Sequence, residues 1–356
     1  MFTAIGRLLE GVSTPTGGLS IASTVCAAIG EPLAGWHSVT DDAVVERIVD
    51  LTPEWVGVAL IALTQLGSVF VVVPLAVLAY WWAPDRLGTW LPAVFAYYGL
   101  MASIKSLNSA TRPEVGPPVG PEAVPSILSG WYDHSTAIAT TSFPSGNAMV
   151  TALIAGLVVV DLRIGSVRSR AAAAVGLIAV VGYSRLGLGV HYPVDVLGGI
   201  ALGLALAGAI VLLRRRVDDD VAAVYVVAVA LALASVWLRS NGFGVPDLAA
   251  LEGSNRVTAL GGALGGLLVW RLGRATDWRF GIERRTAADG FDGNRAKAIA
   301  AGVALVVLGG AYAIDGATTH PLASLLWAAV AFGIVVATPH LLPERLYASL
   351  TRLRRA

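Results

Sequence analysis

The chain has 356 residues, of which 56% are hydrophobic and only 14% are charged, and its mean hydropathy is +0.71. A soluble domain carries about 25% charged residues, so this composition excludes an ordinary globular enzyme and favours a chain that lies mostly in lipid. The formal net charge of +1 gives no electrostatic reason to expect a nucleic-acid partner. The single cysteine, Cys26, excludes an internal disulfide and a cysteine-based metal cluster.

The first 53 residues are predicted to be an N-terminal segment outside the cytoplasm. No signal peptide is expected, because Gly17, Gly18, Glu31 and Pro32 interrupt the early apolar stretch. Residues 41–50 alternate valine and isoleucine with acidic residues at helical spacing. This pattern predicts an amphipathic helix, which either lies on the membrane surface or caps the fold as a soluble helix.

Apolar runs long enough to cross a bilayer follow one another through the rest of the chain. A span needs about 20 mainly apolar residues. The sequence therefore predicts an all-α, polytopic bundle of about nine transmembrane helices. The nine runs are 55–82, 88–107, 146–162, 171–188, 193–213, 221–238, 257–272, 298–314 and 321–342.

Basic residues are distributed unequally between the two sides of this expected bundle. The loops 83–87, 163–170, 214–220 and 273–297, with the C-terminus and the span ends beside them, hold 18 of the 25 lysines and arginines, and the other side holds 7. Positive charge marks the cytoplasmic side, so the N-terminus is predicted to lie outside and the C-terminus inside. The run Arg214–Arg216 is interpreted as an anchor for its loop, and Trp55, Trp81, Trp82 and Trp90 are interpreted as interfacial rings at span ends.

Four glycines in the seventh run form two small-xxx-small pairs, Gly261 with Gly265 and Gly262 with Gly266. Such pairs let helix backbones approach closely. A phosphate-binding loop is the less favoured interpretation, because glycine-rich phosphate loops belong to strand–helix units and no strand pattern is present.

Three basic residues on the outer side lie at or beside span ends. They are Lys105 and Arg112 around the end of the second run, and Arg185 near the end of the fourth. Charges at membrane depth are costly and usually functional. The third run begins at Ser142-Phe-Pro-Ser-Gly-Asn147, where the free backbone N–H groups of a helix start can hold an anion. Three cations and a helix N-terminus together predict a phosphate site.

His191 and Asp195 stand four residues apart, after Arg185 in the sequence. A carboxylate beside an imidazole fixes its tautomer and raises its basicity, as an activated catalytic histidine requires. The pair is therefore the predicted catalytic centre of this phosphate site.

The segments Lys105-x6-Arg112-Pro, Pro144-Ser-Gly-Asn147 and Ser184-Arg-x5-His191-x3-Asp195 occur in this order. Together they resemble the three signature motifs of the type-2 phosphatidic acid phosphatase superfamily, which includes vanadium haloperoxidases, bacterial acid phosphatases and glucose-6-phosphatase. The resemblance covers roughly residues 55 to 213.

The resemblance implies a role for each matching residue. Lys105, Arg112 and Arg185 would bind the phosphoryl oxygens, helped by Ser145 and the Gly146 amide. His191 would attack phosphorus to form a phosphohistidine, oriented by Asp195. No metal and no other cofactor would be needed.

Asn147 departs from the family pattern, in which a histidine stands at this position and protonates the leaving oxygen. Asparagine donates hydrogen bonds but delivers no proton. Three explanations stay open. The leaving group needs no proton, as for the phosphate released from a diphosphate; another residue such as His134 supplies the proton; or the site binds phosphate without rapid turnover, either naturally or because Asn147 is an engineered substitution.

The expected protein is a multi-pass enzyme of the cell membrane that hydrolyses a lipid-linked phosphate or diphosphate at the extracytoplasmic face. Its partners are a lipid phosphate or prenyl diphosphate and membrane lipids. The alternatives are a phosphotransferase to a lipid or sugar acceptor and a catalytically silent phosphate-binding protein. The expected organisation is an N-terminal segment 1–53, a phosphatase-like core 54–213, and a further four-span region with a cytoplasmic tail, 214–356.

Overall fold

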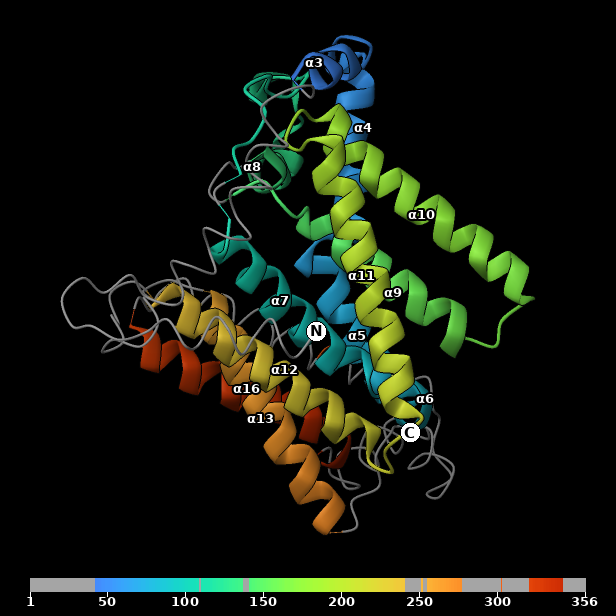
Figure 1. Ribbon diagram of the computed structural model, residues 1–356, viewed down its shortest axis with the longest axis vertical. Helices are drawn as coiled ribbons and strands as arrows, with labels where there is room; N and C mark the ends of the chain where they lie inside the picture. Colours follow the sequence, from blue (N-terminus) through green and yellow to red (C-terminus); the bar gives the residue numbers. More distant parts are fainter. Residues whose placement is uncertain are drawn as a thin grey trace, which may run out of the picture.

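A computed structural model describes residues 42–108, 110–136, 141–240, 251, 255–276, 302 and 320–341 (Figure 1). Within these residues all regular structure is helical, which confirms the predicted class. Five helical segments are long and apolar enough to cross a membrane: Glu54–Trp82, Asp85–Ser106, Pro193–Arg214, Asp220–Arg239 and Pro321–Thr338. Gly146–Asp161 is a shorter apolar helix. Nearly all of the run 298–314 and the whole of the segment 1–41 lie outside the described residues.

The helices follow one another with short connections. They are α3 (Asp42–Asp50), α4 (Glu54–Thr64), η1 (Gln65–Gly67), α5 (Val69–Trp82), α6 (Pro84–Leu87), α7 (Trp90–Ser106), η2 (Pro121–Ala123), η3 (Ser126–Leu128), α8 (Ser129–Thr136), α9 (Gly146–Asp161), α10 (Val167–Gly187), α11 (Pro193–Arg214), α12 (Asp220–Arg239), α13 (Asn255–Ala275) and α16 (Pro321–Leu341).

The first apolar run is two helices rather than the single span that the sequence predicted. Between α4 and α5 the chain makes a 3-10 turn, and Ser68 then adopts an extended conformation. Gly67 packs so closely on α9 that an added Cβ would lie 2.5 Å from Thr151 Oγ1 and 2.8 Å from the Asn147 carbonyl oxygen. The break therefore brings backbone and polar side chains of the first span against the start of α9.

The start of α7 and the ends of α9 and α11 are joined by a polar cluster at one end of the bundle. Asp161 accepts hydrogen bonds from Arg214 at 2.8 and 3.0 Å and from Trp90 Nε1 at 2.8 Å. Arg214 also donates to Thr89 Oγ1. Arg214 is thus an interhelical clamp, and its interpretation as a loop anchor was incomplete.

Two of the four tryptophans expected at the lipid interface are buried instead. Trp90 is 2% exposed and bonded to Asp161, and Trp81 is 1% exposed and donates to the Val335 carbonyl. Trp55 and Trp82 are exposed, at 75% and 46%. An indole N–H needs an acceptor when it is buried, and neighbouring helices supply one for Trp81 and Trp90.

Glycines bring α9 and α11 into close contact at the other end of the bundle, which we call the site end. It is the end where α7 finishes and α9 and α11 begin. A Cβ on Gly199 would lie 2.6 Å from the Ser145 carbonyl oxygen, and one on Gly203 would lie 2.1 Å from that of Met149. The starts of α9 and α11 therefore lie side by side.

Helices α12, α13 and α16 form a second group, seen at the lower left of Figure 1. A Cβ on Gly261 or Gly265 would lie 2.2 or 2.0 Å from a carbonyl oxygen of α16. Gly262 faces Phe95 and Phe332, and Gly266 faces Tyr225. The predicted packing role of these four glycines is confirmed.

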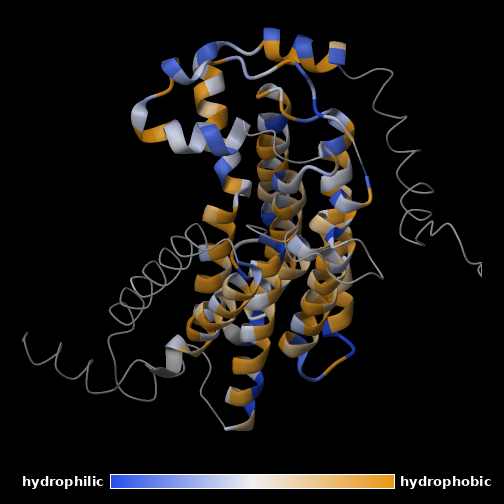
Figure 2. Cartoon of the chain, turned by 90° about the vertical axis from the view of Figure 1, so that its left-hand side faces the viewer, coloured by the Kyte–Doolittle hydropathy of each residue, from blue (hydrophilic) through white to orange (hydrophobic). Residues whose placement is uncertain are grey.

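A cap of short helices covers the site end, and it is more polar than the helices beneath it (Figure 2). In this cap, α3 packs through Val45 and Val49 against Tyr192, whose hydroxyl donates to Asp42 at 2.7 Å. These contacts are those of a capping helix. An association of α3 with the membrane surface stays a prediction.

Candidate active site

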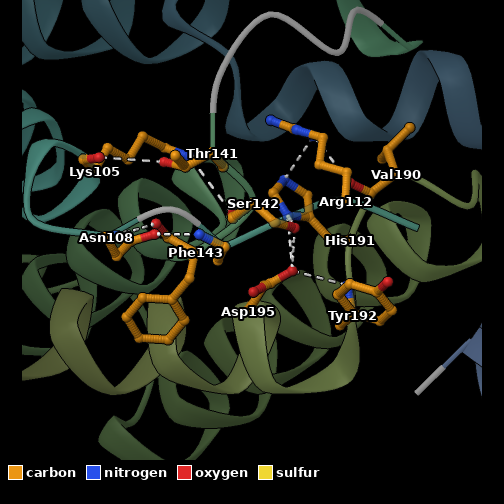
Figure 3. Close-up of polar contacts among 11 residues, drawn as sticks. Lys105, Asn108, Arg112, Thr141, Ser142, Phe143, Val190, His191, Tyr192 and Asp195 are labelled. Atoms are coloured by element: carbon orange, nitrogen blue, oxygen red, sulfur yellow. Dashed lines mark hydrogen bonds and ion pairs between the residues drawn. The ribbon is translucent and has the colours of Figure 1, made fainter. Parts of the chain in front are cut away.

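His191 and Asp195 occupy the turn into α11, and both are buried, with 3% and 0% of their surface exposed. His191 Nδ1 lies 3.4 Å from Asp195 Oδ2 (Figure 3). The same oxygen accepts the Tyr192 backbone N–H at 2.9 Å. Asp195 stands in the first turn of α11, where the helix dipole favours a negative charge. The fold thus holds a carboxylate against one nitrogen of the imidazole.

Arg112 lies on the opposite side of the ring. Its Nη1 donates to the Val190 carbonyl at 2.9 Å and lies 3.5 Å from His191 Nε2. Because a guanidinium only donates, Nε2 faces a cation and Nδ1 faces a carboxylate. This arrangement favours the neutral tautomer with its proton on Nδ1 and its lone pair on Nε2.

Burial sets the charge of His191. Removal from water, together with the charges of Arg185 and Arg112, lowers its pKa to about 3, although the hydrogen bond with Asp195 acts in the other direction. The imidazole is therefore uncharged near neutral pH. A neutral ring with a free lone pair is the form that can act as a nucleophile.

Ser142 completes the contacts of the pair, and sequence reasoning gave it no role. Its hydroxyl donates a short hydrogen bond to Asp195 Oδ2 and lies 3.3 Å from His191 Nδ1. It is fully buried. Its position three residues before Ser145 in the second motif was the one signal available, and the spacing alone does not show where the side chain points.

Lys105, in the last turn of α7, reaches the same segment. Its ammonium donates to the carbonyl of Thr141 and lies 3.5 Å from that of Ser142. One turn on, Asn108 donates to the carbonyls of Ile104 and Phe143. These bonds fasten the end of α7 to the strand-like segment that leads into α9.

The start of α9 contributes Ser145 and Gly146. The Ser145 hydroxyl is buried and has no hydrogen-bond partner in the described structure, whereas its backbone N–H donates to the Asp195 carbonyl at 3.0 Å. Gly146 is partly exposed, and its carbonyl accepts from Tyr97. The first N–H groups of a helix have no intrahelical acceptor, so this end offers donors to an anion.

Arg185 closes the other side from the last turn of α10. Its side chain is 6% exposed, and Nη1 donates to the Ser135 carbonyl at 3.1 Å and to Thr64 Oγ1 at 3.3 Å. Its Nε is buried without a partner in the described residues. Within those residues neither Lys105 nor Arg185 pairs with a carboxylate. Buried cations without a counter-charge indicate an anionic ligand.

Asn147 points toward α4. Its Nδ2 donates to the Thr64 carbonyl at 3.1 Å and to Thr64 Oγ1 at 3.2 Å. His134, the alternative proton donor, is on the exposed side of α8 with its ring against Phe70. Partial burial and the charge of Arg185 lower the pKa of His134. No described contact joins Asn147 or His134 to His191.

Comparison with known proteins matches this arrangement. The PAP2 superfamily profile fits residues 86–219. Phosphatidylglycerophosphatase B of Bacillus subtilis (strain 168) is 30% identical over 177 residues, which are 47% of this chain and 79% of that protein. The chain belongs to the PAP2 superfamily. It is a membrane phosphatase of the type-2 phosphatidic acid phosphatase kind.

A crystal structure of the transmembrane PAP2-type phosphatidylglycerolphosphate phosphatase from Bacillus subtilis also aligns with this chain. The sequence identity is 25% and the TM-score is 0.41, over 56% of this chain and 94% of that one. Helices α3 and most of α4–α5, together with α13 and α16, fall outside the residues that the superfamily profile matches.

Proposed function

We propose that this PAP2 phosphatase hydrolyses a lipid-linked phosphomonoester or diphosphate through a phosphohistidine on His191, at the extracytoplasmic face. The observation that carries the proposal is the buried neutral imidazole, with Asp195 at Nδ1 and Arg112 at Nε2. Lys105 and Arg185 lie around it without carboxylate partners in the described residues.

In the first step the Nε2 lone pair attacks phosphorus, an N–P bond forms, and the P–O bond to the leaving group breaks. The leaving oxygen takes the electron pair. Asp195 accepts the Nδ1 proton in a hydrogen bond and stabilises the positive charge that develops on the ring. Lys105, Arg112, Arg185 and the N–H groups at the start of α9 stabilise the phosphoryl oxygens.

In the second step water attacks phosphorus, the N–P bond breaks, and inorganic phosphate leaves with the imidazole restored. Asn147 supplies no proton to the leaving oxygen in the first step. A phosphate leaving group, as in a prenyl diphosphate, is much less basic than an alkoxide and departs without one. An alkoxide from a lipid monophosphate depends on a proton from solvent.

The lipid nature of the substrate is supported by the position of the site. The catalytic groups lie at the ends of apolar helices, so a head group can reach them while its chains stay in the bilayer. The Bacillus subtilis relative is named for phosphatidylglycerophosphate, and we therefore place this lipid beside phosphatidic acid and a prenyl diphosphate as the first substrates to test.

The test is phosphate release by the purified protein in lipid nanodiscs, with glucose 6-phosphate as the soluble comparison. His191→Ala should abolish release from every substrate because no nucleophile remains, and phosphate label should be trapped on His191 of the wild type. Release by His191→Ala at the wild-type rate would exclude the phosphohistidine. A wild type that binds orthovanadate but turns over no substrate would favour a silent phosphate-binding protein.

The extracytoplasmic face is supported by the distribution of basic residues, 18 on one side and 7 on the other. The test uses two exposed positions in a Cys26→Ser background, Glu122→Cys beside the site end and Arg163→Cys beyond α9. An impermeant thiol reagent should label the first cysteine in intact cells and the second only after lysis. The reverse pattern would overturn the orientation.

A further inference from the structure

The C-terminal end of α4 makes polar contacts with two elements of the site. Thr64 is fully buried, and both of its oxygens are engaged. Its carbonyl and its Oγ1 accept from Asn147, and its Oγ1 also accepts from Arg185. Because a carbonyl only accepts, the amide nitrogen of Asn147 must be the atom that faces Thr64.

These contacts converge on the guanidinium that is expected to bind phosphate. Arg185 has two acceptors on Nη1, Thr64 Oγ1 and the Ser135 carbonyl. Ser135 is itself fastened to the same turn, since its hydroxyl accepts from Gln65 Nε2 at 2.8 Å. Both acceptors of Arg185 are therefore tied to the break between α4 and α5.

The break itself is held close to α9 by Gly67, which leaves no room for a side chain between the turn and the Asn147 backbone. The acceptors are neutral, so they fix the direction of the guanidinium without cancelling its charge. Arg185 thus keeps its full charge for an anion, and its Nε is left without a partner in the described structure.

We infer that Thr64 is a positioning residue for the phosphatase reaction, which aims Arg185 at the phosphoryl group and gives Asn147 an anchoring role in place of acid catalysis. Thr64 lies on a helix that precedes the residues matched by the superfamily profile, 86–219. The inference rests on the proposed function of Arg185 as a phosphate-binding residue.

Thr64→Val tests the inference, because valine keeps the shape of threonine and removes the Oγ1 acceptor. We expect orthovanadate affinity and kcat/KM each to fall by about 10-fold, as when a hydrogen bond to a charged group is lost. Thr64→Ser, which keeps the acceptor, should stay within about 2-fold of wild type.

Thr151→Val is the matched control. Thr151 is also a buried threonine beside Gly67, but its hydroxyl has no hydrogen-bond partner in the described residues. Its variant should bind vanadate and turn over substrate as the wild type does. Equal losses in Thr64→Val and Thr151→Val would assign the effect to helix packing and overturn the inference, as would wild-type affinity in Thr64→Val.

A double-mutant cycle with Arg185→Lys separates positioning from a general loss of structure. Lysine keeps a charge but lacks the guanidinium that donates to Thr64, so adding Thr64→Val to Arg185→Lys should cost less than about 2-fold in vanadate affinity. Full additivity would contradict the inference. Vanadate binding needs no turnover, so an inactive wild type would refute the proposed function while the cycle still decides the role of Thr64.

Discussion

Two regions of this protein pack their helices in different ways. Around the site, α7, α9, α10 and α11 are joined by polar contacts at both ends: Asp161 with Arg214 at one, and Asp195 with Ser142 and His191 at the other. In the second group, α12, α13 and α16 approach through glycines, so closely that any Cβ on Gly261 or Gly265 would meet the backbone of α16. Glycine contacts bring backbones together, whereas polar contacts also fix how helix ends are rotated and placed.

The difference teaches which region can tolerate change without loss of chemistry. In lipid, helix association depends on close packing and interhelical hydrogen bonds. The glycine-packed group is expected to carry stability, and the polar group is expected to carry stability and reaction geometry together. The following experiments would break or sharpen this division.

The largest effect is expected for Asn147→His. If the protein turns over substrate as written, a diphosphate should be cleaved faster than the matching monophosphate. Histidine at this position restores a general acid, so it should raise the monophosphate rate by about 10²–10⁴ and the diphosphate rate much less. Rates unchanged by Asn147→His, together with activity lost in His134→Ala, would identify His134 as the acid.

A second comparison uses two glycines in different surroundings. Gly265→Val forces a side chain against Ala329, and overpacking of this kind costs about 1–3 kcal/mol or more. The thermal midpoint should fall while KM stays unchanged. Gly208 on α11 has no neighbour within 4 Å of an added Cβ, so Gly208→Val is the control and should leave the midpoint near wild type. Equal midpoints would show that α13 and α16 do not depend on this contact.

Arg256 is the place where the glycine-packed group reaches the site. Its Nη1, from the first turn of α13, donates to the Ala102 carbonyl and to Ser106 Oγ in the last turns of α7, beside Lys105. Arg256→Met should loosen this helix end and lower kcat/KM by about 10-fold. Arg271→Met, at a position 65% exposed, should change it little. An unchanged kcat/KM in Arg256→Met would make the two regions functionally independent.

The smallest effect is expected from pH in the range where His191 is neutral. Because its pKa is lowered to about 3, the nucleophile is already deprotonated at neutral pH, and its titration should leave kcat/KM flat from about pH 5 to 8. Stability should follow the opposite group of states. An unfolded histidine with a pKa of about 6.5 binds a proton that the folded one refuses, so the contribution of His191 is present above pH 6.5 and is lost as pH falls toward 3. A kcat/KM step near pH 6.5 that is absent in His134→Ala would assign that titration to His134.

Much of the architecture could be predicted from hydropathy alone. Eight of the nine apolar runs correspond to described helical segments, and the seventh, which looked short, is a helix of 21 residues. The break in the first run was not predicted, because it depends on how closely Gly67 meets α9 and not on a local signal. The burial of Trp81 and Trp90 was missed for the same reason: a span end facing lipid and one facing another helix have the same composition.

The sequence by itself determined a helical membrane protein with a phosphate site, because hydropathy, charge and the order of Lys105, Arg112, Arg185, His191 and Asp195 are properties of the chain. The roles of these residues stay proposals that the experiments above address. Only the tertiary structure decided that Ser142 bridges Asp195 and His191, that Asn147 faces Thr64, and that Arg185 takes its acceptors from α4 and α8. Each of these contacts joins residues from separate segments of the chain, and their meeting depends on helix packing that no local pattern encodes.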